Sequence, residues 1–153
     1  MIAPPVALTT PPPTRPVIPG NIPPQLAERP QWVCWQWKWC QDASKPWTKI
    51  PLNAKTGGPA KTNDPTTWST LSAALAHAQR PNIAGVGFVF STDDPYVGID
   101  VDKCRDPVTG DLTPEAQRIV TELDSYAELS PSGTGVHVIV AGSLPAKGRR
   151  RRG

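Results

Sequence analysis

The sequence predicts an α+β fold with mostly antiparallel strands and with helices on one face of the sheet. Three observations lead to this fold class. Several short segments alternate between apolar and polar residues with period two, as strands with one buried face do. Two segments repeat apolar residues at helical spacing, and each begins with a capping residue followed by proline. A turn rich in Gly, Ser and Pro joins the last two predicted strands, which is typical of a hairpin.

Residues 1–21 form a proline-rich arm that we expect to be disordered. Nine of the 20 prolines fall within residues 1–24, a stretch with almost no charge and no aromatic residue. Because proline fixes φ and lacks a backbone donor, the arm cannot form a helix or a central strand. Order is expected to begin near Asn21, with a short helical turn in residues 22–29.

Residues 32–39 are predicted to form the first strand, and they contain four tryptophans. Val33, Trp35, Trp37 and Trp39 alternate with smaller or polar residues, so one face of this strand should be buried. Core packing is the favoured use of these aromatic side chains, and base stacking is the alternative. Prolines and glycines interrupt residues 40–63, which are expected to form a loop or a ragged hairpin.

Two helices are expected, each opened by a residue that can cap it. The first begins at Asp64, has Pro65 in its first turn, and keeps an apolar face that includes Trp68 and Leu71 until residue 80. The second begins at Thr113, again with proline in the next position. The remaining strands are predicted at residues 85–90, 96–102, 126–130 and 135–141.

Asp100 and Asp102 stand two residues apart in the strand predicted at 96–102. Alternation directs both carboxylates to the face opposite the apolar residues of that strand. Two adjacent carboxylates repel each other, and a divalent cation removes this conflict. Aspartate is unfavourable in strands, so the pair favours a metal site, with a solvent-exposed strand face as the alternative. Gly98, which has no side chain, should leave room for a ligand to approach the sheet.

A Ser/Gly-rich turn and a histidine follow the Asp pair about 30 residues later. The backbone around the glycines can turn tightly and present amide N–H groups to a phosphate. His137 lies on the next predicted strand, opposite its valines, and would flank the metal site if the two strands were neighbours. An ordinary hairpin turn and a structural histidine are the alternatives. The candidate phosphate-binding residues of the turn are Ser130, Ser132, Gly133, Thr134 and Gly135.

In combination, these motifs resemble the archaeo-eukaryotic primase superfamily, in particular the primase-polymerase domains of phages and plasmids. The resemblance covers about residues 22–150 and includes separate motifs in the same order, at residues 31–35, 49–53, 56–58, 63–68 and 85–90. It implies an RRM-like, mostly antiparallel sheet with an additional N-terminal α/β unit. It also implies nucleotidyl transfer from a (d)NTP to a primer 3′-hydroxyl on a single-stranded DNA template.

The resemblance assigns roles to individual residues. Asp100 and Asp102 would bind two divalent ions, Mg²⁺ or Mn²⁺, and His137 would act beside them on the phosphates. Ser132 and Gly133, with Ser130 and Gly135, would bind the triphosphate of the incoming nucleotide. Lys49 would be a further phosphate or template contact, although a surface lysine on a loop is the alternative.

One part of the family pattern has no counterpart in this sequence, namely a third metal-binding acid on a later strand. We therefore expect residues 22–148 to be a partial, truncated primase-polymerase domain that is inactive alone and needs a missing half or a helicase domain, with a basic tail at 149–153. Two other functions are consistent with the sequence. One is a non-catalytic replication module that binds single-stranded DNA through its tryptophan-rich strand and its Arg tail. The other is a sugar-nucleotide transferase that uses the same Asp-x-Asp pair.

The charge distribution argues against a broadly basic binding surface. The formal net charge is +3, but residues 149–152 supply four of the 16 basic residues, and the other 12 are set against 13 acidic ones. An anionic partner must therefore be held locally. No signal-peptide pattern and no apolar run of about 20 residues is present, so a cytoplasmic protein without a membrane segment is expected. The three cysteines lack C-x-x-C spacing, which favours reduced core residues over a zinc site.

Overall fold

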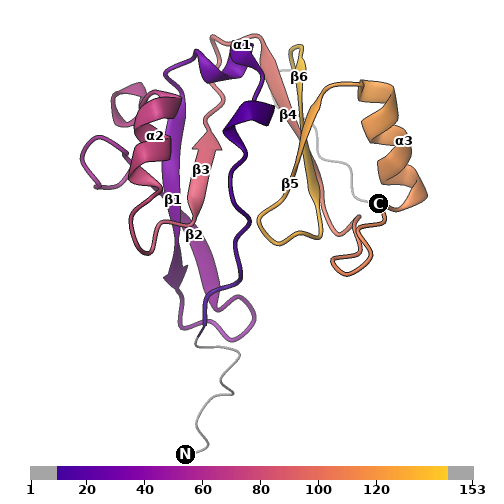
Figure 1. The fold of residues 1–153 in the computed structure, drawn as a ribbon, viewed down its shortest axis with the longest axis horizontal. Coiled ribbons are helices and arrows are strands. Elements are labelled where there is room, and N and C mark those ends of the chain that lie inside the picture. Colours follow the sequence, from indigo (N-terminus) through magenta and orange to yellow (C-terminus); the bar gives the residue numbers. More distant parts are fainter. Residues whose placement is uncertain (1–9, 145–153) are drawn as a thin grey trace, which may run out of the picture. The chain divides into compact units, whose positions relative to one another are not determined.

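The computed structural model describes residues 10–144 (Figure 1). The chain divides into two compact units, one within Met1–Val89 and the other within Phe90–Gly153. Each unit contains its own three-stranded antiparallel sheet, with strand order β2-β1-β3 in the first and β4-β6-β5 in the second. The α+β class and the antiparallel pairing are therefore confirmed. The basic tail predicted at residues 149–153 and the first nine residues of the predicted arm lie outside the described residues.

Short proline-initiated turns precede the first sheet. Residues 11–18 have no regular secondary structure, and they are followed by a 3-10 turn η2 (Pro19–Asn21) and helix α1 (Pro24–Ala27). Proline fits both starts because the first helical N–H groups have no intrahelical acceptor. The helical turn expected in residues 22–29 is confirmed, whereas disorder of the whole arm stays a prediction.

The first sheet is built on strand β1 (Trp32–Trp39), which pairs with β2 (Trp47–Leu52) and β3 (Gly85–Phe88). Residues 40–63, expected to form a loop or a ragged hairpin, contain β2, which completes a hairpin with β1 in which Trp39 lies opposite Trp47 next to the connecting loop. Burial does not alternate along β1, however. Residues 32–34 are all buried, while Lys38 and Trp39 are exposed.

The prediction of a single buried face for β1 was wrong because both faces of its first half are covered. On one side the Sγ of Cys34 donates to the carbonyl of Ala74 in α2 (Leu71–His77), at 3.2 Å. On the other side Val33 packs in a cluster with Trp68 and other apolar residues. The far end of the strand lacks this cover, so Trp39 keeps 39% of its surface exposed and pairs edge-on with Trp47 at 5.1 Å.

The single helix predicted from Asp64 to residue 80 was also wrong. The structure has a 3-10 turn η3 (Pro65–Thr67) capped by Asp64, then an extended break, and then α2. The break exists because Ser69 pairs with Trp32 through two backbone hydrogen bonds of 2.8 and 3.0 Å. Thr70 then provides a second N-cap by accepting from the N–H of Ala73. A distant strand thus overrides the local helical pattern.

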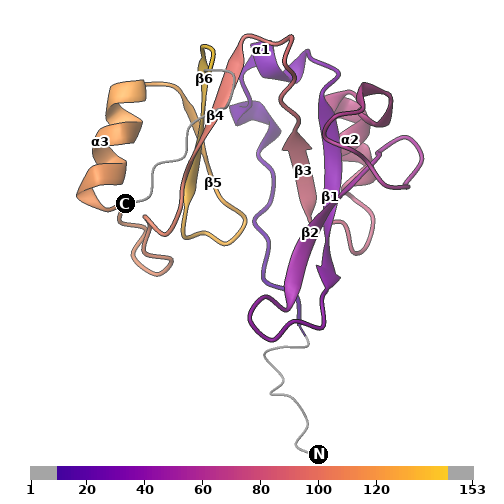
Figure 2. The ribbon, with the colours of Figure 1, turned by 180° about the vertical axis from the view of Figure 1, so that it is seen from behind.

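In the second unit, β6 (Val136–Ala141) lies between β4 (Tyr96–Val101) and β5 (Tyr126–Leu129), and α3 (Pro114–Leu123) packs against one face of this sheet (Figures 1 and 2). Thr113 caps α3, as predicted, by accepting from the N–H of Ala116. The core under α3 is apolar and includes Cys104, Ala116, Val136 and Val138. The strands and the helix predicted for this unit are confirmed to within two residues.

None of the helices in the described region, residues 10–144, combines the length and the apolar character needed to cross a membrane.

The three thiols should differ strongly in reactivity. Cys34 and Cys104 are buried, and burial raises the pKa of Cys34 to about 11, while Cys40 is partly exposed. Because the thiolate is the reactive form, we expect iodoacetamide at pH 8 to label Cys40 at least about 100-fold faster than Cys34. Mass spectrometry of native and urea-unfolded protein measures this difference. Equal labelling of all three cysteines in the native protein would contradict the packing of Cys34 against α2.

Candidate functional site

Three ionisable side chains form a row across the second sheet, on the face opposite α3. The strand register pairs His137 of β6 with Asp100 of β4 on one side and with Glu128 of β5 on the other. Nε2 of His137 lies 3.7 Å from Oδ1 of Asp100, and Nδ1 lies 3.5 Å from Oε1 of Glu128. The Asp100 side chain is 71% exposed, so this row lies on an open surface of the unit.

The apolar residues of the strands determine which face carries this row. Val136 and Val138 are buried in the core with α3, and alternation places His137 between them on the other face. Asp100 is set between Ile99 and Val101, which pack against the same core. The expected adjacency of the Asp100 and His137 strands is therefore confirmed, while the roles of the two residues stay predictions.

Asp102 does not lie on the strand itself. β4 ends at Val101, and Asp102 is an exposed residue of the turn that follows, next to Lys103 with φ of 51°. Within residues 10–144, no three His, Cys, Asp or Glu side chains are arranged as a group that can hold a metal ion. The candidate protein donors are thus the carboxylates of Asp100 and Asp102. Such a set fits Mg²⁺, which keeps several water ligands and binds proteins through one or two carboxylates.

The Ser/Gly turn between β5 and β6 is attached to the segment that follows Asp102. The carbonyl of Thr134 accepts from the N–H groups of Cys104 and Arg105, at 2.8 and 3.0 Å. A Cβ on Gly135 would come within 2.9 Å of the Val101 carbonyl oxygen, so only glycine allows the turn to approach the end of β4 this closely. The turn, the end of the Asp100 strand and His137 are thus brought together within one unit.

The polar groups of this turn bond largely to one another. The Oγ of Ser130 accepts from the N–H of Gly135 at 3.0 Å, and the N–H of Gly133 donates to the carbonyl of Ser130 at 2.8 Å. The hydroxyl of Ser132 lies 3.0 Å from that of Ser130 and 2.8 Å from that of Thr134. The N–H groups of Gly133 and Gly135 therefore hold the turn together here, which differs from the expectation that they point toward a phosphate. Ser132 is exposed at the tip of the turn.

Gly98 does not leave open space beside Asp100, contrary to the prediction. A Cβ at this position would lie 2.7 Å from atoms of the Phe90 ring, which occupies that part of the sheet surface. Phe90 itself is 40% exposed. The absence of a side chain at Gly98 thus accommodates an aromatic ring of the same unit.

Sequence reasoning missed two charged residues near the turn. Glu128 shares the face of His137, and the alternation of Tyr126 and Glu128 with Ala127 and Leu129 contains the signal that could have found it. The hydroxyl of Tyr126 donates to Oε2 of Glu128 at 3.0 Å. Burial first, and then the neighbouring Glu128 carboxylate, raises the pKa of Tyr126, so the phenol keeps its proton.

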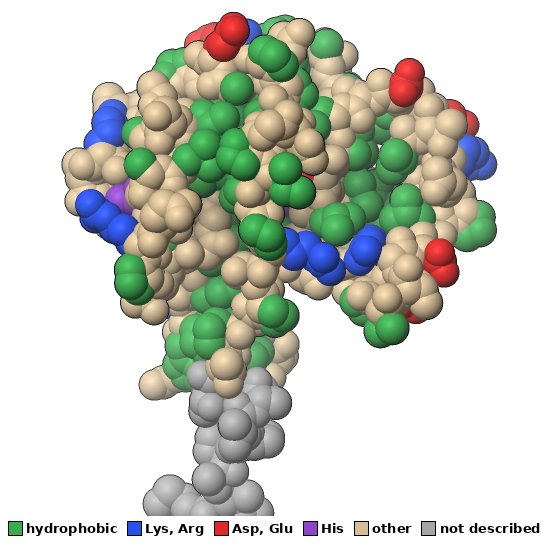
Figure 3. All heavy atoms as spheres, in the orientation of Figure 1, with side chains coloured by type: hydrophobic (Ala, Val, Ile, Leu, Met, Phe, Trp, Pro, Cys, Tyr) green, Lys and Arg blue, Asp and Glu red, His purple; other side chains and the backbone are tan. Residues whose placement is uncertain are grey.

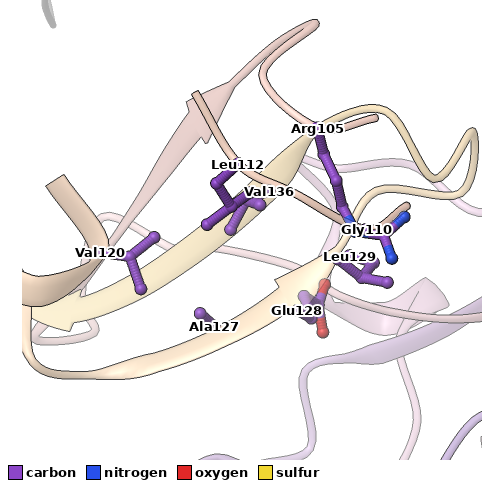
Figure 4. A pocket seen from close by; sticks show the side chains of 8 residues that line it. All are labelled: Arg105, Gly110, Leu112, Val120, Ala127, Glu128, Leu129 and Val136. Carbon is purple, nitrogen blue, oxygen red and sulfur yellow. The ribbon is translucent and has the colours of Figure 1, made fainter. Parts of the chain in front are cut away.

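Arg105 is the second missed residue, and no sequence signal marks it. Its Nη1 donates to the carbonyl of Gly133 at 2.9 Å and so supports the turn from the α3 side. It also lines a pocket of about 260 Å³, in which Val120, Ala127 and Val136 are apolar neighbours (Figure 4). Figure 3 shows hydrophobic side chains gathered at a hollow between β5 and α3. Glu128, a member of the carboxylate row, also lines this pocket, at the edge strand β5.

Lys49 belongs to the first unit, where it lies on β2 opposite Trp37. Its Nζ lies 5.8 Å from the centre of the Trp35 ring, a cation–π distance. The side chain is exposed, and its role in phosphate or template binding stays a prediction.

Comparison with known proteins found a relative that matches most of the chain. No family model matches the sequence. The sequence is 38% identical over 120 residues to the DNA Primase-polymerase of Nitratiruptor phage NrS-1. The alignment covers 78% of this chain but 16% of that protein, so the chain spans about a sixth of the length of this curated relative.

Proposed function

Over its 120 aligned residues the chain belongs to the phage-type primase-polymerases, and from this premise we propose that it forms the metal- and nucleotide-binding part of a nucleotidyl-transfer site. In the proposed reaction, a primer 3′-hydroxyl attacks the α-phosphate of a (d)NTP. The new phosphodiester bond forms as the bond to the β-phosphate breaks, and pyrophosphate leaves. Single-stranded DNA is the proposed template.

One observation carries this proposal. The Asp100 strand precedes the Ser/Gly turn and His137 by about 30 residues in the sequence, yet all three meet at one end of one small sheet. Carboxylates suit hard cations, and a hydroxyl-rich turn next to a histidine suits phosphate oxygens. Nucleotide binding requires both kinds of group within a few ångströms of each other.

Each candidate residue has a separate proposed role. Asp100 and Asp102 would hold Mg²⁺ or Mn²⁺, which when bound lowers the pKa of the attacking hydroxyl and stabilises the leaving pyrophosphate. His137 and the exposed hydroxyl of Ser132 bind the triphosphate, while the N–H of Gly133 supports the turn through the Ser130 carbonyl. Ser130 and Gly135 hold the turn in shape through their mutual hydrogen bond. Lys49 contributes a positive charge to nucleotide or template.

We also propose how each unit corresponds to an RRM-like fold. The β4-β6-β5 sheet with α3 on one face is consistent with part of an RRM-like sheet, and the first unit with the additional N-terminal α/β unit. A third metal-binding acid has no match in this sequence, so the chain is expected to bind nucleotide without extending a primer. We further propose that the chain works with a helicase domain and that it is located in the cytoplasm.

Titration of the purified chain with a fluorescent dNTP tests this function. We expect saturable binding with Mn²⁺ and at least about tenfold weaker binding in EDTA, because the metal neutralises the phosphates. A sugar nucleotide and a labelled single strand are titrated in parallel. Preference for the sugar nucleotide would support a transferase that uses the Asp pair. Metal-independent single-strand binding without dNTP affinity would replace the proposal with an accessory module.

A further inference from the structure

We propose that Glu128 is a positioning residue that fixes the orientation of the His137 ring, and that Tyr126 holds Glu128 in place for this task. The functional consequence of this orientation rests on the proposed function, because the ring nitrogen that faces Asp100 is the one that would face the metal and the phosphates. The contacts that support the inference all lie within the second sheet, between β5 and β6.

The position of the ring between two strands supports this role. His137 occupies the central strand of the sheet and has a carboxylate as its cross-strand neighbour on each side. Oε1 of Glu128 lies 3.5 Å from Nδ1, while Nε2 faces Asp100 at 3.7 Å. An imidazole that is held through one nitrogen presents its other nitrogen in a fixed direction. Glu128 therefore selects which edge of the ring faces Asp100.

Glu128 can act in this way because its own carboxylate is anchored. Its second oxygen, Oε2, accepts from the hydroxyl of Tyr126 at 3.0 Å, which leaves Oε1 directed at Nδ1. Tyr126 and Glu128 are two residues apart on β5, so both side chains share the face of His137. The partly buried phenol keeps its proton because its pKa is raised, and it remains a donor at neutral pH. The result is a chain of contacts, Tyr126 to Glu128 to His137, across two strands.

The first test measures the ring directly and needs no nucleotide. The chain has two histidines, so the His137 ring resonances can be assigned by comparison with His137→Gln. In the full chain labelled at the histidine rings, we expect Glu128→Ala to increase the ring motion measured by relaxation. Glu128→Gln, which keeps an oxygen acceptor, should restore order, and Tyr126→Phe should have a smaller effect than Glu128→Ala. Equal ring order in wild type and Glu128→Ala overturns the positioning role.

The second test asks whether the oriented ring matters for binding. We expect Glu128→Ala to weaken Mn²⁺-dependent dNTP binding about fivefold, a loss comparable to that of one hydrogen bond, because the polar contact with Nδ1 of His137 is removed. Glu128→Gln should weaken this binding less than about twofold. Glu122→Ala is the matched control, since Glu122 is an exposed carboxylate of α3 paired with Arg118 at 3.8 Å. Affinity for Mn²⁺ without nucleotide should not change.

The outcomes separate this inference from the proposed function. Loss of Mn²⁺ affinity in Glu128→Ala would make Glu128 a metal ligand and overturn its positioning role. Loss of dNTP affinity by the same factor in both Glu128 variants would also overturn it, because the acceptor in glutamine would then be irrelevant. A wild-type chain that binds no dNTP refutes the proposed function, while the ring measurement still decides whether Glu128 orients His137.

Discussion

Replacement of Asp100 by asparagine is expected to weaken Mn²⁺-dependent dNTP binding by about 100-fold or more, since even the partners behind metal ligands are worth 10- to 100-fold. Asparagine keeps the size of the side chain but removes the charge that attracts a hard cation. The side chain is 71% exposed and lies on the sheet surface beside His137, so the change should not disturb the core. The loss should therefore appear in metal and nucleotide binding and not in folding.

Fluorescent dNTP titration at several Mn²⁺ concentrations measures this effect, with circular dichroism as the check on folding. Asp111→Asn is the matched control, because Asp111 is an exposed aspartate of the same unit in the loop before α3. Unchanged affinity in Asp100→Asn, or an equal loss in Asp111→Asn, would remove Asp100 from the metal site and with it the main support for nucleotidyl transfer.

Replacement of Gly135 by alanine should destabilise the second unit by about 1–3 kcal/mol, the usual cost of an extra methyl group in a packed site. The new Cβ would lie 2.9 Å from the Val101 carbonyl oxygen and 3.2 Å from the Ser130 hydroxyl. Neither atom can retreat freely, because the first belongs to the end of β4 and the second accepts from the Gly135 N–H. The turn must therefore move away from the Asp100 strand, and dNTP binding should weaken as well.

The choice of probe matters for this measurement. All six tryptophans lie in residues 32–68, within the first unit, so tryptophan fluorescence does not report on the second. Hydrogen exchange of β6 amides and urea unfolding followed by circular dichroism are suitable. Gly142→Ala serves as the control, because a Cβ there meets no atom within 4 Å. Equal stability of the two variants would show that the turn is not packed against Val101.

Local signals were sufficient for most of the second unit. Period-two alternation located β4, β5 and β6, and a capping threonine with proline located α3. In the first unit, the same kind of reasoning failed where distant segments decide the outcome. Ser69 leaves the helical pattern because it pairs with Trp32, and the start of β1 is buried on both faces because α2 and Trp68 cover it. Neither contact has a local signature.

In the candidate site, too, some positions follow from local sequence patterns and others do not. Alternation predicted that Asp100 and His137 each point away from the apolar residues of their strands, whereas the pairing of these strands came from the structure. Alternation applied to β5 would also have placed Glu128 on this face. The positions of Arg105 and Phe90 depend on the paths of irregular segments, which a sequence pattern does not determine. Asp102 was predicted on the strand but lies in the next turn, because β4 ends one residue earlier.

Because β6 pairs with a strand on each side, the unit is sensitive to whether residues are added or removed in odd or even numbers at the start of β6. Deletion of a single residue between Gly135 and His137 would exchange the imidazole with a valine, placing a polar ring against α3 and an aliphatic side chain between two carboxylates. Insertion of two residues at the same place would keep every side chain on its original face of the sheet but shift the histidine along the strand. The unit should therefore tolerate length changes in the loop at residues 106–111 far more readily than any odd-numbered change within its three strands.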